Sequence, residues 1–140
     1  METITLDKDI NVFFVTAASY PDGIPGAHNR LHELVPFSAD RNYFGISRPE
    51  NGPIVYRAAT EEKSRGEAEK YNCDTIVLKK GKYISLTVND FRKDPRSIEK
   101  AFVELLKIPN LDPQGYCVEW YVNDSETVKC MIRLDEQVAE

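Results

Sequence analysis

The amino-acid sequence predicts an α+β fold of two tandem βαββ units, each an antiparallel half-sheet backed by one helix, with a groove between the halves. The first observation is length, because 140 residues make about one ordinary domain. The second is that a strand–helix–strand–strand succession occurs twice. The third is a near-constant offset between the two successions, which predicts an internal duplication within a single domain, residues 1–140. The aligned pairs are Leu31 and Phe102, Leu34 and Leu105, Tyr43 and Tyr116, and Val55 and Val128.

The first unit, at about residues 10–60, follows from its residue types. Its predicted strands are runs rich in β-branched and aromatic residues. Its predicted helix is a stretch with apolar residues at helical spacing, and Pro25 suits the first turn. The Asn51-Gly52 pair tolerates positive φ and predicts a turn between the last two strands. The elements are a strand over residues 10–18, a helix over 25–35, and strands over 42–47 and 54–60.

The second unit, at about residues 81–134, has the clearest helical pattern, because Ile98, Ala101, Phe102 and Leu105 recur at i, i+3, i+4 and i+7. Asp94 is the predicted N-cap of this helix. Residues 61–80 connect the units, and their charged first part predicts a surface segment. The elements are a short strand over 75–78 in the connection, a strand over 82–88, a helix over 97–107, and strands over 116–122 and 127–134 joined by a hairpin turn at 123–126.

The charge balance argues against nucleic acid as a direct partner. The net charge is −5 and no basic run is longer than Lys79-Lys80, whereas a phosphate backbone requires a cationic surface. No apolar stretch approaches the roughly 18 residues that span a bilayer, and the N-terminus lacks the basic region of a secretion signal. Three cysteines cannot all pair. These features predict a cytoplasmic protein that does not enter a membrane.

Glu119 is the residue that points most directly to a site. Acidic residues are depleted from strands, yet Glu119 lies in the apolar run YCVEWYV, and the aligned residue of the first unit is Ile46. A buried carboxylate must be hydrogen-bonded, protonated or matched by a cation. Two interpretations stay open: Glu119 contacts a ligand, or it is a surface residue paired with Arg57, Lys129 or Arg133.

Strand alternation assigns the neighbours of Glu119 to two faces. Cys117 and Tyr121 share its face, which we expect to line a groove on the side of the sheet that the helices do not cover. Trp120 then points the opposite way, and we expect it to pack under the helix over residues 97–107, near Phe102 and Leu105.

Aromatic residues in the predicted strands could surround a cationic ligand, because each ring face attracts a cation by about 0.5–2 kcal/mol. The alternative is that individual rings belong to the core. Tyr56 and Tyr121 are preferred, since a hydroxyl group can orient a carboxylate or a ligand. The predicted ligand-binding residues are Glu119, Tyr56, Tyr121, Phe44, Tyr83 and Phe14.

The other reactive residue types predict no catalytic residue, metal or cofactor. His28 and His32 are four residues apart, as a metal site requires, but no third ligand is evident and no H-E-x-x-H motif occurs. No base is expected beside Cys73, Cys117 or Cys130, so these are interpreted as small buried residues. The sequence also lacks a glycine-rich phosphate loop.

The order of short motifs resembles the GyrI-like family, bacterial small-molecule-binding domains related to the gyrase inhibitor and to the effector-binding domains of AraC-type and MerR-type regulators. The motifs are Gly81-Lys82-Tyr83 before a helix, Gly115-Tyr116-Cys117-Val118-Glu119-Trp120-Tyr121, and, in the first half, Tyr43-Phe44-Gly45-Ile46 and Val55-Tyr56-Arg57-Ala58.

The resemblance covers about residues 10–134 and implies a groove for hydrophobic, often cationic, compounds, with a strand glutamate as counter-charge. That glutamate corresponds to Glu119. Family regulators also carry a helix-turn-helix module, whereas about ten residues precede the first predicted strand, so the chain resembles a stand-alone member.

Three functions from different classes follow. The first is a cytoplasmic domain that binds a small hydrophobic or cationic effector and has a regulatory role. The second is a hydrolase that uses Glu119 as a general base, since some GyrI-like relatives are hydrolases. The third is an inhibitor that binds a protein partner, as the gyrase inhibitor does. Non-enzymatic small-molecule binding is the preferred prediction.

Overall fold

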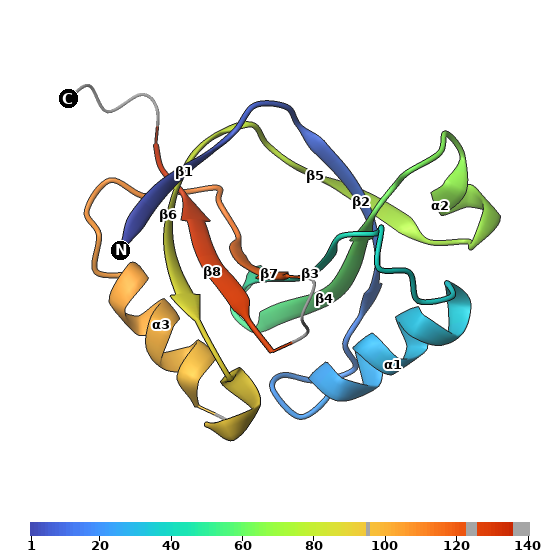
Figure 1. Ribbon diagram of the computed structural model, residues 1–140, viewed down its shortest axis with the longest axis horizontal. Helices are drawn as coiled ribbons and strands as arrows, with labels where there is room; N and C mark the ends of the chain where they lie inside the picture. The colour runs from blue at the N-terminus through green and yellow to red at the C-terminus, as the bar shows by residue number, and fades with distance from the viewer. Residues whose placement is uncertain (95, 123–125, 136–140) are drawn as a thin grey trace.

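The computed structural model describes residues 1–94, 96–122 and 126–135. Within these residues the chain forms one antiparallel sheet of eight strands, three α-helices and a short 3-10 helix (Figure 1). The strands are β1 (Glu2–Leu6), β2 (Ile10–Thr16), β3 (Tyr43–Pro49), β4 (Ile54–Glu61), β5 (Asp74–Leu78), β6 (Gly81–Val88), β7 (Cys117–Tyr121) and β8 (Val128–Arg133). The helices are α1 (Ile24–Leu34), α2 (Glu67–Lys70), the 3-10 helix η1 (Phe91–Lys93) and α3 (Ser97–Leu105).

The strand order is β1-β6-β8-β7-β3-β4-β2-β5. This order is symmetric about its centre. If β1 is exchanged with β5, β2 with β6, β3 with β7 and β4 with β8, the same order is read from the other end of the sheet. Each half therefore has the succession β-β-α-β-β, and β1 and β5 exchange places: β1 pairs with β6, and β5 pairs with β2. This symmetry agrees with two related units, and the duplication itself stays a prediction.

Most of the predicted elements are confirmed within one or two residues. Two elements are additional, because β1 precedes the predicted first strand and α2 lies in the predicted connection. The two predicted half-sheets are one continuous sheet, joined where β3 pairs with β7. The predicted N-cap of α3 is wrong: Arg96, not Asp94, occupies the N-cap position, and its side chain makes no capping hydrogen bond. The Asp94 carboxylate instead accepts the backbone N–H of Arg96 at 3.0 Å. The predicted turn at 123–126 lies outside the described residues except for residue 126.

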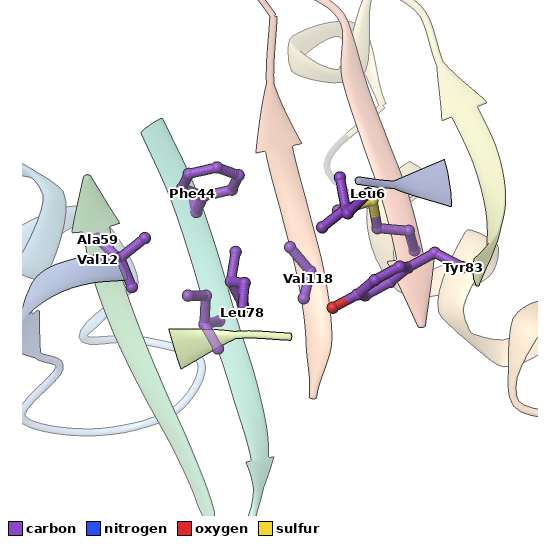
Figure 2. Packing of buried hydrophobic residues seen from close by; sticks show 9 residues of the cluster. Leu6, Val12, Phe44, Ala59, Leu78, Tyr83 and Val118 are labelled. Carbon is purple, nitrogen blue, oxygen red and sulfur yellow. The ribbon is translucent and has the colours of Figure 1, made fainter. Parts of the chain in front are cut away.

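The sheet curls (Figure 1) and encloses a core of its own. This inner core takes at least one buried side chain from each of the eight strands, and Figure 2 shows these side chains converging from both halves. Leu6 and Leu78, from the two edge strands, belong to the same cluster. The buried members are Leu6, Val12, Phe44, Ile46, Ala59, Leu78, Tyr83, Val118 and Met131.

The helices pack on the outer face of the curl. Ala27 and Leu31 of α1 pack on β2 and β4, whereas Ala101 and Leu105 of α3 pack on β6 and β8. In the strand order, the central strands β3 and β7 lie between the pair of strands that α1 covers and the pair that α3 covers (Figure 1). The sheet therefore has two apolar faces, and the helices cover only the outer one.

Candidate functional site

Glu119 is a buried carboxylate at the centre of β7, opposite Gly45 of β3. Only 8% of the residue is exposed. The Tyr56 hydroxyl donates to its Oε1 at 2.9 Å and the Tyr121 hydroxyl at 2.5 Å. Among the described residues Glu119 has no ion pair. The predicted alternative partners contact other groups: Arg57 pairs with Glu50, Arg133 pairs with Asp112, and Lys129 lies over the Trp120 ring.

Gly45 makes the hydrogen bond between Tyr56 and Glu119 possible. Tyr56 is on β4 and Glu119 is on β7, with β3 between them. A β-carbon at position 45 would lie 2.7 Å from Glu119 Oε1 and from Tyr56 Cζ, closer than side chains pack. Sequence reasoning missed this residue, although a glycine inside the strand NYFGIS is itself a signal, because such glycines often mark a close approach by another group.

His28, from α1, completes the polar cluster. Its Nε2 lies 2.8 Å from the Tyr56 hydroxyl oxygen, and its ring makes edge contacts with the Tyr56 and Tyr121 rings at 5.7 and 5.6 Å between centroids. Tyr56 has one hydroxyl proton, which it donates to Glu119. His28 must therefore be the donor in the second hydrogen bond, with its proton on Nε2. From the sequence, His28 was considered only as a possible metal ligand together with His32.

Burial controls the protonation of this cluster. It raises the pKa of Glu119 above the ordinary value, and the hydrogen bonds from Tyr121 and Tyr56 oppose that rise. Burial, with a smaller contribution from the nearby His32, lowers the pKa of His28 to about 4. His28 is therefore neutral at pH 7, in agreement with its role as a donor through Nε2 alone, and supplies no positive charge to Glu119.

The structure separates the six predicted ligand-binding residues into two groups. Tyr56 and Tyr121 lie with Glu119 on the outer face. Phe44 and Tyr83 are buried in the inner core, and Phe14 packs against that core. Alternation along the strands correctly predicted which residues share a face but not which face the helices cover.

Two predictions that depend on this choice of face are wrong. Trp120 packs against Phe44 of the inner core, at 5.8 Å between rings, and not under α3. Cys117 and Tyr121 instead pack against the cluster under α3, so the face that carries Glu119 is the helix-covered one. The physical reason is the curl, which gives the helix-free face its own apolar core. The alignment of Ile46 with Glu119 is also wrong, because Ile46 pairs with Val118 and points into the inner core.

A hollow of about 420 Å³ opens beside Tyr56. Small-molecule sites measure about 300–1,000 Å³. The Tyr20 ring lies at this hollow, 6.4 Å from the Tyr56 ring, and the pKa of Tyr20 is raised by burial and by the charge of Glu119. The lining residues are Thr16, Ala17, Ala18, Ser19, Tyr20, Pro53, Ile54, Val55 and Tyr56.

The cysteines are free thiols with no feature of a nucleophile. Cys130 is buried as predicted, whereas Cys73 and Cys117 are half-buried. Burial raises the pKa of Cys117 to about 11 and that of Cys130 to about 12, so both are protonated at pH 7. Within the described residues no three His, Cys, Asp or Glu side chains gather as metal ligands would.

Comparisons with known proteins identify the fold. No family model and no curated protein matches the sequence. Three solved structures share the fold at low identity. An integron cassette protein, VCH_CASS2, from the mobile metagenome of Vibrio cholerae is 10% identical, with a TM-score of 0.68 and coverage of 95% of this chain and 94% of that one. SAV2435, solved bound to tetraphenylphosphonium, is 12% identical, with a TM-score of 0.67 over 97% and 94%.

The third structure is a putative bacterial transcription regulation protein from Staphylococcus aureus MU50. It is 12% identical, with a TM-score of 0.64 and coverage of 96% of this chain and 97% of that one. The chain therefore shares its whole architecture with these three proteins. Among the described residues, no helix has the length and apolar character needed to cross a bilayer.

Proposed function

We propose that the chain is a GyrI-like binding domain that holds a small hydrophobic cation beside Tyr56, with Glu119 as counter-charge. This proposal rests on the buried carboxylate of Glu119, which has no basic partner among the described residues. Burying an ionised carboxylate costs several kcal/mol unless a cation or hydrogen bonds compensate. Two hydroxyl groups compensate part of that cost, and a bound cation would supply the missing charge.

The surroundings of the carboxylate suit such a ligand. The hollow lies beside Tyr20 and Tyr56, and the rings of Tyr121 and His28 complete the aromatic surroundings of Glu119. A cation over the face of an aromatic ring gains about 0.5–2 kcal/mol. The apolar parts of the ligand would cover the hollow, and the ring faces and Glu119 would attract its charge. The tetraphenylphosphonium bound to SAV2435 is a hydrophobic cation, which supports this ligand class.

The proposed role is that of a single effector-binding domain acting in the cytoplasm, without a direct contact to nucleic acid or membrane. Binding would regulate by removing the compound from solution or by changing a contact with another protein. The transcription-regulator description of one structural neighbour supports a regulatory role. Inhibition of a protein partner stays a prediction from the sequence. Co-purification of a defined protein from cell extract, with no small molecule bound, would favour it.

Calorimetric titration with tetraphenylphosphonium at pH 7 tests the proposal. We expect wild type to bind and Glu119→Gln to bind at least tenfold more weakly, a difference of about 1.4 kcal/mol or more. Glu104→Gln is the matched control, because Glu104 of α3 is a half-exposed carboxylate that pairs with Lys107. This control variant should bind like wild type. Equal affinity in the Glu119 and Glu104 variants would show that Glu119 is not the counter-charge.

Hydrolysis is a second candidate function, favoured by the hydrogen-bonded series His28–Tyr56–Glu119. Glu119 would accept a proton from a water molecule whose oxygen bonds to an activated carbon of the substrate. The bond from that carbon to its leaving group would break, and the leaving group would take up the proton from Glu119. Product formed by wild type and by Glu104→Gln, but not by Glu119→Gln, would favour catalysis over binding alone.

A further inference from the structure

We propose, building on the cation-binding function above, that the site selects cations by their number of N–H donors. It takes cations with none or one, such as phosphonium, quaternary ammonium and tertiary ammonium groups. It rejects guanidinium and primary ammonium groups of the same charge. The arrangement of hydrogen bonds on Glu119 carries this inference.

One of the two carboxylate oxygens is already used. Tyr56 and Tyr121 both donate to Oε1 of Glu119, and these two bonds occupy the two lone pairs of that oxygen. Oε2 has no partner among the described residues. Oε2 is not one of the fully buried side-chain atoms without a partner there, which are Arg41 Nε, Arg57 Nε and Ser85 Oγ. Glu119 therefore offers a ligand a single free acceptor atom.

Several of the neighbouring acceptors are already used. The Tyr56 hydroxyl donates to Glu119 and accepts from His28. Around the hollow, four backbone carbonyl groups already accept N–H groups of the protein. These are Thr16, from the Arg30 side chain, and Ser19, Pro53 and Tyr56, from backbone groups.

The number of donors then decides which cations fit. A quaternary group brings none, and the single N–H of a tertiary ammonium can bond to Oε2. A primary ammonium brings three donors and a monosubstituted guanidinium five, so several would lose water without gaining a partner. Unpaired buried donors weaken binding. A guanidinium normally binds both oxygens of a carboxylate with two parallel bonds, and the two tyrosines occupy the oxygen that its second bond needs.

Tyr121 is the residue that tests this inference most directly. Its hydroxyl bonds to Glu119, whereas that of Tyr56 also accepts from His28. Tyr121→Phe keeps the ring but frees one lone pair of Oε1, which restores two acceptors for a planar donor group. Tyr116→Phe is the matched control, because the Tyr116 ring lies under the Arg48 guanidinium and packs against the inner core.

The experiment is calorimetric titration at pH 7 with four cations that share a 4-phenylbenzyl group and end in trimethylammonium, dimethylammonium, ammonium or guanidinium. Tetraphenylphosphonium is the reference ligand. For wild type we expect the first two cations to bind at least tenfold more tightly than the last two. Tyr121→Phe should reduce the preference over guanidinium at least threefold, and Tyr116→Phe should leave it unchanged.

The possible failures are distinguishable. If wild type binds tetraphenylphosphonium and all four cations within threefold of one another, selection by donor number is wrong and the binding function stands. If it binds neither tetraphenylphosphonium nor any of the four, the proposed function is wrong and the inference falls with it. A wild-type preference that Tyr121→Phe leaves unchanged, in a variant with a native circular dichroism spectrum, overturns the role of the blocked oxygen.

Discussion

Replacing Gly45 by alanine tests whether the space above β3 holds the buried carboxylate in position. The φ angle of Gly45 lies outside the left-handed region, so the backbone itself permits alanine. In an ordinary strand this substitution would stabilise the fold by about 0.5–1 kcal/mol. A destabilising result therefore requires a specific steric cause.

The added methyl group supplies that cause. It would lie 2.7 Å from both Tyr56 Cζ and Glu119 Oε1, and closer still to the Tyr56 hydroxyl oxygen, whereas ordinary contact begins at 3.4 Å. The ring and the carboxylate must therefore each retreat by at least 0.7 Å (3.4 − 2.7). Overpacking costs about 1–3 kcal/mol, and the displaced hydroxyl loses its bonds to Glu119 and His28, about 1 kcal/mol each. After the strand gain of about 0.5–1 kcal/mol is subtracted, we expect a net loss of about 2–4 kcal/mol.

Urea unfolding followed by circular dichroism measures this loss. In the double variant with Tyr56→Phe the two hydrogen bonds are already absent, so adding alanine at position 45 should cost about 1–2 kcal/mol less than in wild type. Gly26→Ala is the control, because a β-carbon there would meet only the Arg30 side chain at 3.8 Å, and it should not destabilise. A Gly45→Ala protein as stable as wild type refutes the proposed packing.

The remaining predictions concern charge and the two faces of the sheet. Glu119→Gln should raise stability at pH 7 although it weakens cation binding. Burial raises the pKa of Glu119 above 4.5, so the folded protein holds this proton more tightly than the unfolded chain. The gain measured by urea unfolding should therefore shrink as pH falls through the raised pKa toward 4.5 and change no further below 4.5. A gain independent of pH contradicts this. Arg41 holds the pKa of Glu67 at about 2 across a 2.6 Å ion pair. The stability advantage of wild type over Arg41→Met should therefore be present above pH 4.5 and decline as pH falls toward 2. An advantage that stays constant with pH excludes the ion pair as its source. Trp120 fluorescence should not shift when tetraphenylphosphonium saturates the protein, because Trp120 lies on the inner face; a clear shift would place the ligand inside the curl.

Local patterns in the sequence were sufficient to predict most elements. Helical spacing identified α1 and α3, because a helix on a sheet must place apolar residues on one side. The strand β1 was missed, since an edge strand at the N-terminus is recognisable only through its partner β6. Glu119 was found because a carboxylate in an apolar strand is unusual, and Tyr56 and Tyr121 because their hydroxyl groups can serve it. His28 was missed because nothing distinguishes it before α1 is packed on β4. Gly45 was missed although a glycine inside a strand is itself a signal of a close approach.

The sequence by itself determined most of the elements, the repeated strand–helix–strand–strand succession and the residues that share a face with Glu119. Only the tertiary structure decided which face that is. Alternation has a period of two, so it separates Glu119 from Trp120 without saying which of them meets a helix. The choice depends on the curl of the eight-stranded sheet, which comes from pairings far apart in the chain, such as β1 with β6 and β3 with β7. Because that curl encloses its own core, the helices cover the outer face. Glu119 lies on that face, on the central strand β7, and is hydrogen-bonded to Tyr56.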